Sequence, residues 1–215
     1  MTHTAIAALA RKAAQCTLEV EDLLRVASKP AADVADALDA LATEQGWPAH
    51  PCFPAVPLAT WAAVVSVYCR AGHDGLFEIA REPDMLPFVL GLLEALKTDE
   101  ALATVVRIAG GDAIAGRADA RQTGAIVSAL NLAAMNSRSG GPTESDRVAG
   151  RNFLHAASAR AGNADQWASL VCALRFFGDE TSLDVISACP PLPPHWEPAR
   201  KAAVRAIKRA ARRPG

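Results

Sequence analysis

Apolar residues recur at intervals of three and four positions along most of this chain, with polar residues between them. One example is the run in which Leu58, Trp61, Val65 and Tyr68 share one side. Such spacing places side chains on a single face of a helix. Alternation at every second position, which is typical of strands, is nearly absent. The pattern therefore predicts an all-α fold.

Capping residues, glycines and prolines divide this pattern into short helices. The first predicted helices cover residues 4–28, with a break near 16–17, and then 30–46, 58–71 and 74–81. A helix capped by Asp84 follows, and the next helices cover residues 98–110, 117–136, 143–161 and 164–177. A short helix with Leu183 and Ile186 precedes the last one, at residues 196–212. Residues 46–57 contain four prolines and two aromatic residues, so we predict an ordered crossing loop there. Residues 137–142 are predicted to form a flexible linker.

Helices come in pairs, and one kind of pair recurs along the chain. An acidic turn, a short amphipathic helix, a break and a longer helix follow one another at the end of the sequence. The apolar pair Leu102 and Val105 lies 81 residues before the equivalent pair Leu183 and Ile186, which is close to two periods of about 40 residues. Leu76 precedes Leu102 by 26 residues, so the spacing is irregular.

A helical hairpin with an apolar stripe on each helix buries both stripes by stacking against neighbouring copies. We therefore predict an α-solenoid of stacked antiparallel helix pairs that forms a single domain over residues 1–215. Residues 1–57 are expected to be a divergent N-terminal cap. Residues 58–136 and 143–213 are expected to be repeat-like, with 137–142 as the linker between them.

The last part of the chain resembles a HEAT repeat. The resemblance is carried by Phe177-Gly178-Asp179 through Leu183, by the proline turn 190–194, and by residues 197–203 with Arg200 and Lys201. It covers residues 173–210 and is weaker over 58–136. This armadillo-type family implies an irregular right-handed superhelix, here of about ten helices, whose second helices line a concave binding face. It implies no reaction.

The charge is unevenly distributed. The 215 residues carry a formal net charge of −1, with 51% hydrophobic and 21% charged residues, as in an ordinary globular protein. Residues 1–112 hold 15 acidic against 8 basic side chains, whereas residues 113–215 hold 8 against 14. A total so close to neutral argues against a nucleic-acid-binding surface that covers the molecule.

The basic excess gathers on the last predicted helix, where we place the main candidate site. Its partner-binding residues are Arg200, Lys201, Arg205, Lys208 and Arg209, with Trp196 before them as an aromatic anchor. Three- and four-residue steps put several of these cations on one stripe that can meet an acidic partner or phosphates. The other interpretation is a solvated helix whose cations suit its own dipole.

A second candidate surface is acidic. Asp33, Asp36 and Asp39 lie on one face of the helix predicted at residues 30–46 and can meet a basic partner. The other interpretation is the exposed polar face of an amphipathic helix.

No motif predicts catalysis, a metal site or a cofactor. His50 and Cys52 lack a second pair of ligands at fixed spacing, and His73 with Asp74 has no accompanying nucleophile. Gly110 and its neighbouring glycines are not followed by Lys-Ser or Lys-Thr, which a phosphate-binding loop requires.

The sequence also suggests a compartment. It has no secretory signal and no apolar run long enough for a membrane helix, and its five cysteines are odd in number and scattered. We expect reduced thiols and a cytoplasmic protein without a membrane partner. The alanine- and arginine-rich composition suggests a bacterial source.

These observations favour a non-enzymatic protein-binding module, such as an adaptor, an inhibitor or an immunity-like protein, whose partner is another protein. The alternative is a nucleic-acid-binding HEAT-like protein that uses the C-terminal basic helix, with an enzyme that resembles the alkylpurine DNA glycosylases as one form of this alternative. A lyase or chaperone for a chromophore, as in some HEAT-like proteins, has no specific support in the cysteines or histidines.

Overall fold

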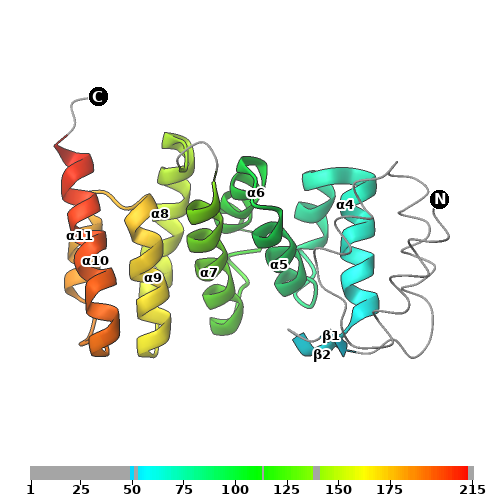
Figure 1. Ribbon diagram of the computed structural model, residues 1–215, viewed down its shortest axis with the longest axis horizontal. Helices are drawn as coiled ribbons and strands as arrows, with labels where there is room; N and C mark the ends of the chain where they lie inside the picture. Colours follow the sequence, from blue (N-terminus) through cyan, green and yellow to red (C-terminus); the bar gives the residue numbers. More distant parts are fainter. Residues whose placement is uncertain (1–48, 51–52, 113, 138–140, 213–215) are drawn as a thin grey trace. The chain divides into compact units, whose positions relative to one another are not determined.

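The computed structural model describes residues 49–50, 53–112, 114–137 and 141–212 (Figure 1). The helices predicted at residues 4–28 and 30–46 lie outside the described residues. The described part is almost entirely helical, which confirms the all-α prediction apart from one short hairpin. The chain divides into two compact units, Met1–Ala95 and Leu96–Gly215, which we call unit 1 and unit 2. The assignment of residues 1–215 to one repeat domain stays a prediction.

The hairpin corrects the loop predicted at residues 46–57. Strand β1 (Ala49–His50) pairs antiparallel with β2 (Phe53–Pro57), and Ala49 lies opposite Pro57 in the register. A proline cannot donate to a strand ladder and is therefore confined to edges. Both strands of a two-stranded sheet are edges, so the prolines of this segment are compatible with the pairing.

Unit 1 continues with helices α4 (Leu58–Ile79) and α5 (Leu86–Leu96). The predicted helix end at Gly72 is a kink inside α4, where this glycine has φ 59° and ψ −146°. A positive φ is readily adopted by glycine, which has no Cβ. The predicted helices 58–71 and 74–81 are thus joined without an intervening loop. Leu76 in the second of them is fully buried.

Unit 2 consists of the remaining helices. They are α6 (Asp99–Gly110), α7 (Ala120–Asn136), α8 (Glu144–Ser158), α9 (Ala164–Phe177), α10 (Ser182–Ser187), the 3-10 turn η1 (Pro194–Trp196) and α11 (Glu197–Ala211). The side chains of Thr98, Thr143 and Asn163 accept hydrogen bonds from backbone N–H groups at the starts of α6, α8 and α9. Such caps satisfy donors that a helix cannot pair internally.

Helix α7 begins three residues later than predicted because a capping box sets its start. The backbone N–H of Gln122 donates to Asp119 Oδ1 at 2.7 Å, and the backbone N–H of Asp119 donates to Gln122 Oε1 at 3.1 Å. This reciprocal pair is a strong start signal. Residue 117, the predicted start, precedes it.

The helices of unit 2 pack as three consecutive pairs, α6 with α7, α8 with α9, and α10 with α11. The first helices contact one another in the order α6, α8, α10, and the second helices in the order α7, α9, α11 (Figure 1). Their apolar faces form a continuous core. Its fully buried members include Ile126, Leu130, Leu154, Leu174, Phe177 and Ala203.

Candidate functional site

Helix α11 is anchored to the rest of unit 2 by one narrow apolar face. Ala203 and Ile207 on this face are buried, and α11 packs against α9 and α10. A Cβ added to Gly178, the residue after α9, would lie 2.9 Å from Cδ1 of Ile207. The absence of a side chain at Gly178 therefore permits the close approach of α11.

The opposite side of α11 carries the predicted cations. Lys201, Arg205, Lys208 and Arg209 are all exposed to solvent. The structure thus confirms that these side chains are accessible, whereas their role in binding stays a prediction. With Arg200 and Arg212, the helix and its C-cap hold six cations against a single acidic residue. An opposite charge placed near them gains Coulomb energy from several cations at once.

Arg200 is the exception among the five. It is half-buried, and its Nε donates to Glu197 Oε2 at 3.2 Å, one helical turn away. This carboxylate already neutralises part of its charge. Both side chains are still partly open to water, and ion pairs near the surface contribute about 1 kcal/mol or less, so a partner's carboxylate can compete for the guanidinium.

A groove lies between α10 and α11, and we call it the basic groove. Its volume is about 470 Å³, and its lining consists of Ile186, Ser187, Arg200, Lys201, Val204 and Arg205. Ile186 is buried and Val204 half-buried, so the groove has an apolar floor with cations at its rim. This combination suits a ligand with both an apolar side chain and an acidic group.

Trp196 does not line the basic groove. It ends η1 immediately before α11, with its ring 5.5 Å from the ring of His195 between centroids. The side chain is half-buried, and its indole Nε1 is enclosed without a hydrogen-bond partner among the described residues. The structure therefore places Trp196 at the base of α11, and its role as an anchor for a partner stays a prediction.

Two of the predicted cations also lie beyond the groove. Lys208 and Arg209 belong to the last turn of α11, where positive charge is favourable for the helix dipole. They extend the exposed basic face past the groove. The acidic candidates Asp33, Asp36 and Asp39 lie outside the described residues.

A hydrogen-bond network around the Gly-Asp turn was missed by the sequence reasoning. Arg151 of α8 pairs with Asp179 at 2.9 Å, and His155 Nε2 lies 2.8 Å from Ser182 Oγ. The Gly178-Asp179 turn was itself a visible signal, but its partners on α8 are 27 and 28 residues away in the sequence and depend on tertiary packing. Ser182 is fully buried, so it cannot act as a nucleophile on a substrate from solvent.

The three cysteines in the described part of the chain show no sign of activation. Burial raises the pKa of Cys69, Cys172 and Cys189, and each is a free cysteine. A raised pKa lowers the fraction of reactive thiolate. Within the described part of the chain, no three His, Cys, Asp or Glu side chains are grouped as metal ligands would be.

The structure also bears on membranes. None of the helices among residues 58–112, 114–137 and 141–212 combines the length and apolar character that a bilayer crossing requires.

Comparison with known proteins adds no relative. No protein-family model, no curated protein and no solved structure matches this chain.

Proposed function

We propose that this protein is a non-enzymatic, cytoplasmic protein-binding module, of the adaptor, inhibitor or immunity type, that uses the surface of a HEAT-like α-solenoid. The observation that carries the proposal is the basic groove, which combines exposed cations with an apolar floor on a helix held in place by its opposite face. The partner we propose is a protein with an acidic segment.

The order of helices in unit 2 supports the solenoid. In each of the three consecutive pairs, the first helix contacts the first helix of the next pair, and the second helix contacts the second. Such packing between nearest neighbours is characteristic of helical repeats. Irregular helix lengths, from the six residues of α10 to the 17 of α7, suit an irregular member of this class. Right-handed coiling belongs to the same proposal.

The chemistry of the groove supports an acidic partner. Lys201 and Arg205 are one turn apart on α11, and both are exposed at the rim. Complementary charges accelerate the diffusional association of two proteins and disfavour partners that carry the same charge. The apolar floor at Ile186 and Val204 adds contact area that pure charge attraction lacks.

The experiment is an affinity capture from a native lysate, with the full chain as bait and proteins identified by mass spectrometry. The wild-type bait is compared with Lys201→Glu/Arg205→Glu, and with Arg117→Glu/Arg121→Glu as the matched control. The control residues are also exposed and lie outside the basic groove, Arg117 just before α7 and Arg121 in its first turn. We expect an acidic protein captured by the wild type and the control and lost from the groove variant.

Capture should also weaken as salt rises, because screening shortens the range of charge attraction. Recovery of nothing above the empty resin at low salt contradicts the proposal. Equal capture of the same partner by both double variants would assign binding to another surface.

A nucleic-acid-binding function is the second candidate, and the six cations of α11 and its C-cap are the observation that favours it. Each phosphate contact would release a counterion and make affinity fall steeply with salt. Fluorescence anisotropy with labelled duplex DNA tests it, using Arg205→Glu/Lys208→Glu as the weakened variant. Absence of binding at low ionic strength eliminates this candidate.

A further inference from the structure

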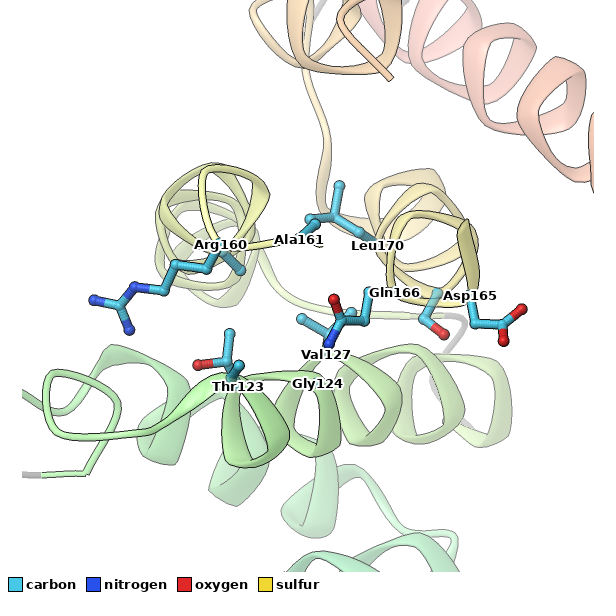
Figure 2. A pocket seen from close by; sticks show the side chains of 11 residues that line it. Thr123, Gly124, Val127, Arg160, Ala161, Asp165, Gln166 and Leu170 are labelled. Carbon is cyan, nitrogen blue, oxygen red and sulfur yellow. The ribbon is translucent and has the colours of Figure 1, made fainter. Parts of the chain in front are cut away.

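A second hollow, of about 210 Å³, lies in unit 2 between the first half of α7, the end of α8 and the start of α9 (Figure 2). We call it the α7–α9 pocket. It shares no lining residue with the basic groove. The lining residues that matter here are Thr123, Gly124, Val127, Arg160, Gln166 and Leu170.

The size and walls of the pocket suit a compact apolar group. Val127 and Leu170 are buried to 4% and 1% exposure and form opposite walls on α7 and α9. No atom lies within 4 Å of the place that a Cβ on Gly124 would occupy, so the missing side chain leaves the floor open. A dry cavity of about 150 Å³ accepts benzene. The α7–α9 pocket therefore has room for one such ring with a few more atoms.

Thr123 brings an unpaired polar group to this pocket. The residue is 5% exposed, and its Oγ1 has no hydrogen-bond partner among the residues that the structure describes. A buried hydroxyl without a partner is unfavourable, and native structures satisfy nearly all such groups. Thr123 and Arg160 also line a neighbouring hollow, which places them at the boundary between the two. Figure 2 shows the Thr123 hydroxyl pointing to the side on which the Arg160 guanidinium lies.

Arg160 and Gln166 also bring donors to the pocket, whose lining further includes Ser169 and the carboxylate of Asp165. Arg160 uses Nη1 to donate to the backbone oxygen of Ala118 at 3.3 Å, and a guanidinium has four further N–H groups. Gln166 Oε1 accepts from the backbone N–H of Gly162 at 2.8 Å, which leaves the amide NH₂ of this side chain as a donor. Figure 2 shows the carboxylate of Asp165 directed away from the other labelled residues. Donors and one positive charge together match an anionic acceptor.

We propose that the α7–α9 pocket binds a small carboxylate with a compact apolar body. The carboxylate accepts hydrogen bonds from the Arg160 guanidinium, and from Thr123 Oγ1 once rotation about the Cα–Cβ bond turns this enclosed hydroxyl toward the ligand. The apolar body lies over Gly124 between Val127 and Leu170. The donor set gives selectivity for the charge, because hydrogen bonds to an ionised acceptor are roughly twice as strong as neutral ones.

The test uses benzoate as the probe and benzamide as its neutral match, with calorimetric or NMR titration of the full chain. For a ligand of this size we expect saturable binding of benzoate with a Kd near about 1 mM. Benzamide is expected to bind about tenfold more weakly or not at all. Thr123→Val and Arg160→Gln should each weaken benzoate binding about tenfold. Gly124→Leu should abolish it by filling the floor.

Two control variants keep these outcomes interpretable. Arg175→Gln removes an exposed cation from α9, and Arg121→Leu adds a leucine to α7, at positions that do not line the pocket. Both should bind benzoate as the wild type does, and circular dichroism verifies that every variant is folded. Equal affinity for benzoate and benzamide overturns the proposal. So does unchanged benzoate binding in folded Gly124→Leu, or a wild type that shows no saturable binding up to about 10 mM.

Discussion

His155 and Ser182 join α8 to the start of α10 through a contact of 2.8 Å between Nε2 and Oγ. Ser182 Oγ also accepts from the backbone N–H of Asp179 at 3.2 Å, so its own hydrogen is available to the imidazole. Ser182 is fully buried. The hydroxyl therefore acts as a fixed link between the first helices of two consecutive pairs.

We predict that acidification weakens unit 2 through His155. Burial lowers the pKa of His155, Asp179 raises it and Arg151 lowers it again, with a net decrease. The unfolded chain therefore binds a proton at a higher pH than the folded chain does. The contribution of neutral His155 to the free energy of unfolding is therefore fully present above the ordinary histidine pKa of about 6.5. It is lost as the pH falls from there through the lower pKa that His155 has in the folded chain. Thermal unfolding at several pH values between 5 and 8 measures this loss.

His155→Gln should flatten the pH dependence over the same interval, at a cost of about 1 kcal/mol from the altered hydrogen bond to Ser182. His195→Gln, which replaces an exposed histidine on η1, is the matched control and should keep the wild-type profile. A profile for His155→Gln that parallels the wild type would assign the acid sensitivity to other groups.

A second prediction concerns the ion pair between Arg151 and Asp179, whose atoms lie 2.9 Å apart. Burial raises the pKa of Asp179, but hydrogen bonds from Thr181 and the charge of Arg151 outweigh this and lower it overall. The contribution of ionised Asp179 to stability is therefore present above the ordinary aspartate pKa and is lost only below about pH 4. This pH range lies below the one in which His155 acts.

A double-mutant cycle measures that ion pair. Arg151→Ala, Asp179→Ala and the double variant should give a coupling free energy of about 0.2–1 kcal/mol, because the carboxylate is partly exposed and screened by water. The Asp179 variant alone should cost more than the Arg151 variant, since it also removes the acceptor of the Thr181 hydroxyl and N–H groups. A coupling of zero means that the pair forms no net interaction in solution.

A third prediction compares two glycines inside helices. A Cβ on Gly150 of α8 would overlap Cδ1 of the fully buried Phe177 and lie 2.8 Å from its Cε1, whereas one on Gly124 meets nothing within 4 Å. Gly150→Ala should lower the free energy of unfolding by about 1–3 kcal/mol through overpacking. Gly124→Ala should raise it by about 0.5–1 kcal/mol through helix propensity.

Urea unfolding of both alanine variants tests this opposition of sign. Phe177→Leu should lessen the added cost of Gly150→Ala in a double variant, because it removes the ring that the new methyl group meets. Equal effects of the two glycine substitutions would contradict the close packing of α8 against Phe177.

A fourth prediction concerns the enclosed indole nitrogen of Trp196. Because Nε1 has no partner within the described part of the chain, Trp196→Phe should leave stability unchanged or raise it by about 1 kcal/mol. Trp196→Ala should instead destabilise, since it removes a half-buried ring at the base of α11. Differential scanning fluorimetry of the two variants distinguishes these effects. A loss of stability in Trp196→Phe as large as that in Trp196→Ala would mean that the nitrogen is hydrogen-bonded in solution.

Most helix boundaries in unit 2 were predictable because they depend on neighbours three or four positions away. Thr98 and Thr143 cap helices at the predicted places, and α9 has the predicted bounds of residues 164–177. The errors arose where a less obvious local interaction prevailed, as in the Asp119 capping box. The hairpin at residues 49–57 was missed because its prolines obscured a pairing that is possible in an isolated two-stranded sheet.

The amino-acid order alone thus established the helices, their apolar faces and the gathering of cations on α11, because periodicity and capping act within one or two turns. Tertiary packing decided the rest. It buried Ala203 and Ile207 on one face of α11 and left most of its cations exposed, and it joined α10 to α11 as a groove. It also brought Thr123 and Arg160, from different helix pairs, to one pocket. Contacts between residues so distant in the chain follow from how helix faces interlock, which local spacing does not encode.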